Sequence, residues 1–133
     1  MISTLDTAAS ALTAQRVRMD TVANNLANLN TTRQADGTIE PYRRRFVVFE
    51  PQRDVAGNPG VRVAAIKQDP TPFPKVFDPG HPDANSDGFV QMPNVDLAIE
   101  SVNMLDASRA YEANVTMIET TKAMLNAALR LIA

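Results

Sequence analysis

Proline and glycine, the residues that interrupt helices, are confined to the middle of the sequence. All nine prolines and all five glycines lie between residues 37 and 93, so residues 1–36 and 94–133 contain neither. Six of the seven aromatic residues also lie in this middle part. Because uninterrupted segments favour helix and breaker-rich segments favour turns and short strands, the sequence predicts a helix at each end of an irregular centre.

This distribution defines the expected fold class and domain organisation. We predict an α+β protein whose two long terminal helices form an antiparallel coiled-coil-like hairpin around a small β-rich central domain. The N-terminal helix takes residues 1–32, the centre takes 33–93, and the C-terminal helix takes 94–133. Within the centre, residues 42–50 and 60–67 carry β-branched or aromatic residues between turn formers and predict two strands.

Both terminal segments carry apolar residues at heptad spacing. Leu5, Leu12, Met19 and Leu26 recur in the first, with Val22 in the companion row, and Met104, Tyr111, Ile118 and Leu125 recur in the second. Heptad spacing is typical of helices that pack lengthwise. Such helices are roughly 40–50 Å long, and a small centre cannot cover their apolar stripes. The helices must therefore pack on each other or on other molecules, and we assign these residues to a subunit interface.

Polar residues mark the ends of both helices. Asn94 or Asp96 can cap the start of the second helix. Asn28 or Asn30 can end the first, because asparagine tolerates the left-handed conformation found at helix ends. Gln15 is a polar interruption in the companion row of the first stripe.

Composition excludes several functional classes. The chain contains no cysteine, which rules out disulfide frameworks, thiolate metal sites and thiol nucleophiles. Its net charge of −2 argues against a dedicated nucleic-acid-binding protein. No apolar run reaches the length of a membrane span, and the first residues lack the basic and apolar regions of a secretory signal peptide. We expect no nucleic-acid partner, no direct membrane insertion, and any export to use another route.

The segment 83–88 begins like a calcium-binding loop but does not continue as one. Its twelfth position is Asn94, which cannot supply a bidentate carboxylate, and Pro82 and Pro93 exclude flanking helices. His81, the only histidine, has no nucleophile or acid arranged around it by the sequence. We interpret the segment as a polar turn and His81 as a solvent-exposed loop residue. We expect no metal, no cofactor and no catalytic residue.

Arg43, Arg44 and Arg45 form a basic run beside two aromatic residues. The run is compatible with phosphate or an acidic partner, with solvated arginines at the start of a strand, and with a salt bridge to a neighbouring subunit. Because the chain is net negative, nucleic acid is the least favoured of these partners.

Four asparagines fall within residues 24–30, near the end of the first helix. Asparagine is a poor helix former because its side chain competes for backbone hydrogen bonds. One interpretation is a C-terminal helix cap. The other is that the amides of Asn24, Asn25 and Asn28, which both donate and accept hydrogen bonds, fix the register of a subunit contact.

The asparagine segment resembles a known family signature. Residues 23–31 (ANNLANLNT) are similar to the N-terminal signature of flagellar axial proteins, the subunits of the rod and hook. Further blocks resemble the proximal-rod family of the flagellar basal body, in the same order, at residues 10–16, 41–44, 48–50, 78–84, 92–95 and 108–115. The resemblance therefore covers nearly the whole chain, although Asp96 stands where the family usually has asparagine.

The resemblance implies a structural subunit and not an enzyme. Terminal helices of such proteins pack into an inner tube with a small β-rich domain outside, and the flagellar type III apparatus exports the chain without a cleavable signal peptide. The implied location is the periplasmic rod of the basal body. The implied partners are copies of the chain, other proximal-rod proteins, the basal-body adaptor protein, the distal rod and the export apparatus. The implied function is a drive-shaft subunit that transmits torque for motility.

Two other functional classes are weighed against this one. A soluble helical adaptor or export chaperone for flagellar axial proteins would share the amphipathic helices, but would hold a stable fold alone and stay in the cytoplasm. An enzyme is disfavoured because no nucleophile, acid–base pair or ligand set converges in the sequence.

Overall fold

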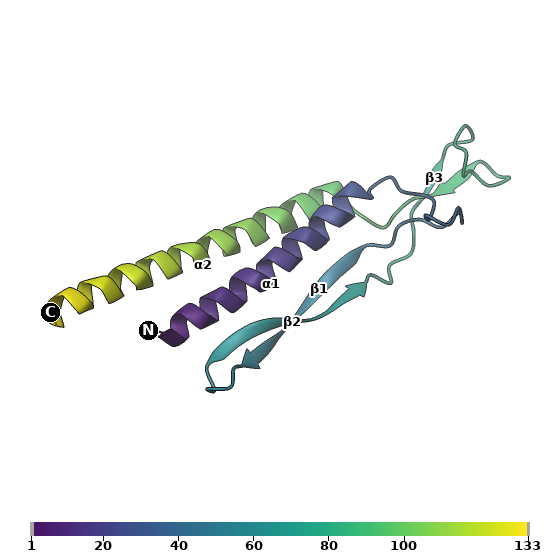
Figure 1. Ribbon diagram of the computed structural model, residues 1–133. Helices are drawn as coiled ribbons and strands as arrows, with labels where there is room; N and C mark the ends of the chain where they lie inside the picture. Colours follow the sequence, from purple (N-terminus) through teal and green to yellow (C-terminus); the bar gives the residue numbers. More distant parts are fainter. Residues whose placement is uncertain (1, 133) are drawn as a thin grey trace.

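The computed structural model describes residues 2–132, which form two helices and two small antiparallel sheets (Figure 1). The elements follow in the order α1 (Ile2–Ala27), β1 (Arg45–Arg53), β2 (Pro59–Gln68), β3 (Lys75–Phe77), β4 (Phe89–Gln91) and α2 (Leu97–Ile132). The predicted α+β class, with long terminal helices and a small β-rich centre, is confirmed.

Both helices are regular despite their many threonines. The hydroxyls of Thr13 and Thr21 in α1, and of Thr116 and Thr121 in α2, each donate to the carbonyl four residues earlier, at 2.8–3.1 Å. A hydroxyl bonded in this way leaves the backbone hydrogen bonds of the helix intact. Because α1 and α2 contain no proline or glycine, they run without a break, and the threonine hydroxyls are satisfied locally.

The helix ends confirm one predicted cap and correct another. The carboxylate of Asp96 accepts from the N–H groups of Ala98 and Ile99 at 2.8 and 3.1 Å, so Asp96 is the N-cap of α2. At the end of α1, the Asn28 side-chain amide donates to the Asn24 carbonyl at 2.8 Å. The expected left-handed asparagine is wrong, because among residues 2–132 only glycines have positive φ.

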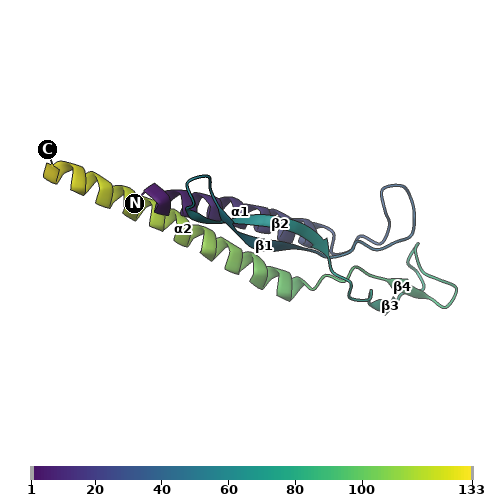
Figure 2. The same cartoon turned by 90° about the horizontal axis from the view of Figure 1, so that it is seen from below.

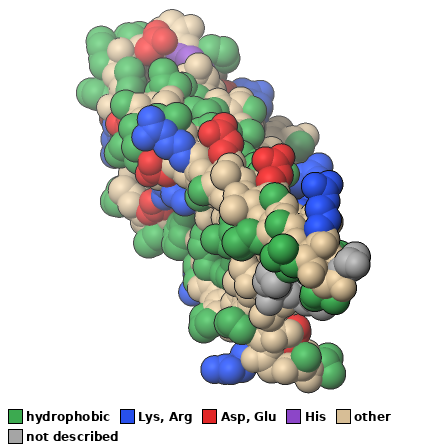
Figure 3. All heavy atoms as spheres, turned by 90° about the vertical axis from the view of Figure 1, so that its left-hand side faces the viewer, with side chains coloured by type: hydrophobic (Ala, Val, Ile, Leu, Met, Phe, Trp, Pro, Cys, Tyr) green, Lys and Arg blue, Asp and Glu red, His purple; other side chains and the backbone are tan. Residues whose placement is uncertain are grey.

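α1 and α2 lie side by side, and the two chain termini lie at the same end of the molecule (Figure 1). α2 has 36 residues and α1 has 26, so α2 is about 15 Å longer at 1.5 Å per residue. Its C-terminal end extends beyond the start of α1 (Figure 2). Viewed from this end, the surface shows many apolar side chains among the polar ones (Figure 3).

β1 and β2 form an antiparallel hairpin. Both predicted strands are present, although β1 begins and ends three residues later than predicted. Its turn is closed by Asp54, whose carboxylate accepts from the backbone and side-chain N–H groups of Asn58 at 2.8 Å, and by Gly57 at a φ of 82°. The register shifts between Val48 and Phe49, which is a β-bulge. Bulges increase strand twist, which lets the hairpin follow the side of a helix.

The hairpin lies along α1, so that α1 is between the hairpin and α2. The Thr7 hydroxyl donates to the Pro59 carbonyl at 2.6 Å, and the Val61 N–H donates to the Ser10 hydroxyl at 3.1 Å. A Cβ atom at Gly60 would stand only 3.0 Å from the Ser10 Oγ atom. Gly60 therefore permits the close approach of β2 to α1.

β3 and β4 form a second small sheet at the end of the molecule remote from the termini. Its centre is the buried Val90, and the rings of Phe77 and Phe89 meet edge to face at 5.3 Å. β3 lies in a proline-rich segment, between Pro74 and Pro79. It forms one strand of a two-stranded sheet, where flanking prolines leave no ladder hydrogen bond missing.

The core of the described chain is small. Its buried apolar side chains are Ala8, Ala14, Val22, Val90 and Ala107. Two of the three largest fully buried side chains, Glu100 and Asn25, are polar. Neither α1 nor α2 is long and apolar enough to cross a membrane. The chain thus relies on a polar junction where most proteins of this size place apolar residues.

Candidate functional site

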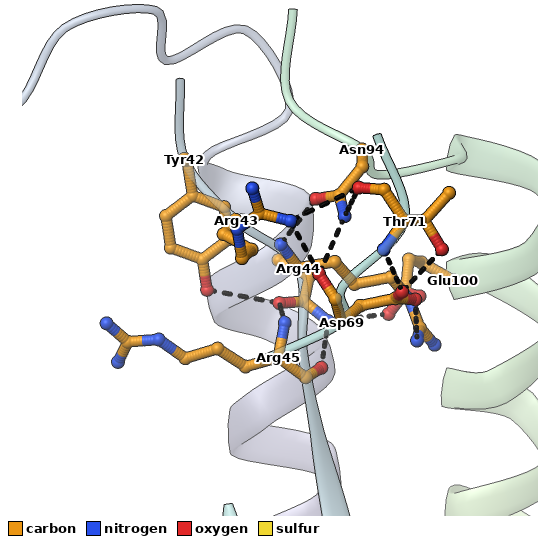
Figure 4. Close-up of polar contacts among 9 residues, drawn as sticks. Tyr42, Arg43, Arg44, Arg45, Asp69, Thr71, Asn94 and Glu100 are labelled. Carbon is orange, nitrogen blue, oxygen red and sulfur yellow. Dashed lines mark hydrogen bonds and ion pairs between the residues drawn. The ribbon is translucent and has the colours of Figure 1, made fainter. Parts of the chain in front are cut away.

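The polar junction joins the end of α1, the start of β1 and the first turn of α2 (Figure 4). At its centre is Glu100, which is 0% exposed. Its carboxylate accepts from Arg44 Nε at 2.6 Å and from Asn25 Nδ2 at 3.0 Å, and the Arg44 guanidinium also contacts the Asp69 carboxylate at 3.3 Å. A buried carboxylate is unfavourable unless it is paired and hydrogen-bonded, and these contacts meet both conditions.

Both the oxygen and the nitrogen of the Asn25 side-chain amide form hydrogen bonds within the chain. Its oxygen accepts from the Tyr42 hydroxyl and from the Arg45 N–H, both at 3.0 Å. Its nitrogen donates to the Arg45 carbonyl at 2.7 Å and to Glu100. The amide therefore pairs with the Arg45 backbone as a neighbouring strand would, and it fixes β1 against α1. Asn25 thus sets register within one chain, and its role at a subunit contact stays a prediction.

The other two predicted asparagines lie outside the junction. Asn24 is exposed, and Asn28 is half-buried beside it. The Asn28 side chain also accepts from the Thr31 hydroxyl at 3.1 Å. A role for Asn24 and Asn28 at a subunit contact stays a prediction.

Asn94 extends the junction toward the segment that follows β2. Its oxygen accepts from the Arg44 N–H at 2.7 Å, and its nitrogen donates to the carbonyls of Asp69 and Thr71 at 3.2 and 3.0 Å. The Arg43 guanidinium donates to the same two carbonyls at 2.8 and 3.2 Å. Asn94, expected only as an alternative helix cap, thus ties the segment before α2 to the start of β1 and to the segment after β2.

The basic run therefore divides into three different environments. Arg43 lies over the ring of Phe73, 4.3 Å from its centre, and Arg44 belongs to the junction. Arg45 is exposed, with its guanidinium 5.8 Å from the centre of the Tyr42 ring. The interpretation of all three as solvated arginines is wrong for Arg43 and Arg44, because their guanidiniums hold backbone carbonyls and carboxylates of the same chain.

Two groups of the junction have shifted pKa values. Hydrogen bonds from the Thr71 hydroxyl and backbone N–H, with a further contribution from Arg44, lower the pKa of Asp69 below its ordinary 3.8. Burial raises the pKa of the Tyr42 hydroxyl. Both shifts favour the protonation states in which Asp69 accepts and Tyr42 donates the bonds described above.

Asp83 connects the loop after α1 to the β3–β4 unit. Its carboxylate accepts from Arg33 and from the Thr32 hydroxyl, and these bonds lower its pKa. The Asn85 side-chain oxygen accepts from the N–H groups of Asp87 and Phe89, and the segment 83–88 is a turn, as predicted. His81 is half-buried and its Nδ1 accepts from the Asp83 N–H at 3.0 Å, so its assignment as a solvent-exposed residue is wrong.

The predicted interface stripes form the less exposed faces of the two helices. Val22 is buried, and the remaining stripe residues are half-buried: Leu5, Leu12, Met19, Leu26, Met104, Tyr111, Ile118 and Leu125. Along α2 the heptad series is shielded from Met104 to Leu125, with Ala107 at 0% exposure, whereas Ile132 at its end is 83% exposed. We refer to this face of α2 as the inner stripe.

α2 carries a second apolar stripe that the sequence prediction missed. It consists of side chains that are 46–88% exposed, namely Ile99, Val102, Met117, Met124 and Leu131. At 100° per residue Met117 and Met124 are each about 100° from the inner-stripe residue that follows them, so these side chains form a separate face beside the inner stripe, and we call them the outer stripe. The signal was present in the sequence, because Met117, Met124 and Leu131 are also seven residues apart. A helix with two separate apolar faces requires a partner for each face.

Comparison with known proteins shows the family. Residues 5–33 match the family described as flagella basal body rod protein, and residues 86–131 match the flagellar basal body rod FlgEFG protein C-terminal family. The flagellar basal-body rod protein FlgC of Bacillus subtilis (strain 168) is 46% identical, over 96% of this chain and 95% of the relative. The chain belongs to the FlgC family of flagellar basal-body rod proteins.

Further FlgC relatives agree. That of Borreliella burgdorferi is 40% identical over 99% of this chain and 97% of its own length, and that of Salmonella typhimurium (strain LT2) is 41% identical over 94% and 92%. Membership of the FlgC family makes the chain a structural subunit of the flagellar basal-body rod, and these relatives are rod proteins and not enzymes. The two matched regions contain almost all of α1 and α2, the elements that carry the apolar stripes.

Proposed function

We propose that this chain is a subunit of the proximal rod, assembled through α1 and α2 into the drive shaft that transmits torque. The observation that carries the proposal is the outer stripe of α2, which stays exposed although α1 already covers the inner stripe. An exposed apolar stripe that runs from Ile99 to Leu131 would be a liability on a free monomer. The exposed stripe is accounted for when each α2 packs on α1 of its own chain through the inner stripe and on a helix of a neighbour through the outer stripe.

In this proposal α1 and α2 act as one antiparallel coiled-coil-like unit. The junction around Glu100 fixes the α1–α2 register at one end, and the heptad stripes continue it toward the termini. Long helices resist twisting because small contacts add up over their whole length. The Asn24 and Asn28 amides lie near the end of α1, where they can contact the next subunit.

The proposed partners are copies of the chain, other proximal-rod proteins, the basal-body adaptor below and the distal rod above. The proposed location is the periplasmic part of the basal body, which the chain reaches through the flagellar export apparatus without a cleavable signal peptide. The small core supports this route, because a chain with few buried apolar side chains unfolds at low cost before export. The adaptor or export-chaperone alternative has no observation of its own in its favour.

The test is mass spectrometry of detergent-extracted, purified hook–basal bodies from the source cell. We expect the chain to be present at a stoichiometry comparable to that of the other rod subunits. The matched comparison is the cytoplasmic fraction of the same cells. A chain found only in the cytoplasmic fraction would contradict the proposal and favour an adaptor.

A further inference from the structure

A groove of about 350 Å³ opens between α1, the start of β1 and the beginning of α2. Arg18 from α1 and Arg44 and Arg45 from the start of β1 line it, with Phe46 and Phe49 among its apolar side chains. No carboxylate lines it. The groove therefore combines positive charge with an apolar surface, in a chain whose net charge is negative.

Only part of this positive charge is compensated. Arg44 pairs with the carboxylates of Glu100 and Asp69 in the junction. Within residues 2–132, the guanidiniums of Arg18 and Arg45 form no ion pair and donate no hydrogen bond. Two free guanidiniums beside apolar side chains suit a carboxylate that is itself surrounded by apolar groups.

The outer stripe of α2 supplies such a carboxylate. Asp106 lies seven residues after Ile99 and seven before Ala113, in the line of the stripe between Val102 and Met117. It is exposed and forms no ion pair with a described residue, including Arg109 one turn away. A single acid within an exposed apolar stripe is the counterpart of a basic groove with apolar walls.

We propose that the outer stripe of one copy docks in this groove of a second copy, with the Asp106 carboxylate between Arg18 and Arg45. The inference rests on the proposed function, because it specifies how neighbouring subunits meet. The two surfaces are different faces of the same chain, so the contact is heterologous. A heterologous contact does not close after two copies but repeats along a ring or an open helix.

Charge reversal tests the contact in flagellated cells. Arg18→Glu together with Arg45→Glu is expected to lower the amount of chain in purified basal bodies about tenfold, because facing like charges strongly disfavour an interface. Adding Asp106→Arg to that variant is expected to restore most of the loss. The matched controls are Arg16→Glu and Glu112→Arg, which reverse exposed charges on the same two helices outside the groove and the outer stripe.

A photo-reactive amino acid at position 106 identifies the occupant. An adduct of two copies, joined to the peptide that contains Arg18 or the start of β1, would support the proposal. An adduct only with another rod protein, or with a different part of this chain, would overturn it. Normal incorporation of the Arg18→Glu/Arg45→Glu variant would also overturn it and leave the proposed function intact, whereas absence of the unaltered chain from basal bodies would refute the function itself. Circular dichroism of each purified variant shows whether its helices form.

Discussion

Glu100 is a carboxylate without solvent contact at the point where both helices and the hairpin meet. Such a group stabilises a fold only while its partners remain, because an unpaired buried charge costs several kcal/mol. Those partners are Arg44, which immediately precedes β1, and Asn25, which lies in α1. The junction therefore makes the three elements depend on one another.

Removal of one partner should reveal this dependence. Arg44→Met leaves Glu100 buried and unpaired, and is expected to lower the free energy of unfolding by about 3 kcal/mol. The double variant Arg44→Met/Glu100→Met should recover much of this loss, because it removes both charges. Urea unfolding of the purified chains, followed by circular dichroism, measures both values. A loss below about 1 kcal/mol for Arg44→Met would show that the pair is dispensable.

The depressed carboxylate pKa values predict a loss of stability in acid. Asp69 and Asp83 have folded-state pKa values below the ordinary 3.8. A group of this kind contributes stability that is present above its unfolded pKa and is lost as the pH falls through its folded pKa. We expect the urea midpoint to fall as the pH drops below about 4.

Two substitutions check the assignment of this acid response. Asp69→Asn/Asp83→Asn should lower the midpoint at neutral pH and flatten its dependence on pH below about 4, since two of the responsible groups no longer titrate. Asp20→Asn is the control, because this exposed residue of α1 forms no ion pair within residues 2–132. An unchanged pH dependence in the double variant would assign the response to other carboxylates.

At the scale of elements, one buried polar atom of α1 is left without a hydrogen bond. The Gln15 Oε1 atom is buried and accepts no hydrogen bond from the described residues. Gln15 occupies the companion row of the α1 stripe, where the sequence already showed a polar interruption. An unsatisfied buried acceptor is destabilising, so α1 here is not optimised for the isolated chain.

Gln15→Leu should therefore stabilise the chain. We expect a gain of about 1 kcal/mol in the free energy of unfolding, because the substitution removes the unsatisfied acceptor and adds apolar contact. Arg16→Leu, at the exposed neighbouring position, should change it by less than about 0.5 kcal/mol. A destabilised Gln15→Leu variant would mean that this amide has a partner in solution or that the site is too tight for leucine.

The elements themselves were largely predictable, and the reason is local. Breaker positions, heptads and the Asp96 cap act over a few residues, so they identify α1 and α2 without knowledge of the rest. The junction was not predictable, because Asn25 and Glu100 are 75 positions apart in the sequence. Neither residue type indicates which distant residue it will contact. The outer stripe is a local feature that was nevertheless missed. Its heptad spacing is visible in the sequence, but the inner series on the same helix is longer and was assigned first.

At the scale of the whole molecule, most large apolar side chains of α2 outside the inner stripe are exposed. The two stripes of α2 therefore differ in what they contact. The inner stripe contributes to the fold of one subunit, and the outer stripe is available to neighbours. The two roles should separate on substitution.

Paired substitutions on adjacent positions test this separation. Ile118→Asp places a charge in the half-buried inner stripe, and should both destabilise the chain and abolish rod assembly. Met117→Asp/Met124→Asp alters only exposed positions, and should leave the free energy of unfolding within about 0.5 kcal/mol while abolishing motility. Swimming assays and urea unfolding provide the two readouts. A motile Ile118→Asp strain with normal flagella would contradict the role of the inner stripe.

The unequal lengths of the two helices have a mechanical consequence. Because α2 is ten residues longer than α1, the two helices of one subunit cannot both end at the same height on the side where the termini lie. In the proposed rod, subunits stacked end to end would therefore meet at staggered joints, with the joint between two α2 helices offset from the joint between two α1 helices. At each joint of one helix, a twisting load would then pass through the unbroken backbone of the other helix, and such a shaft would lack a common plane of shear.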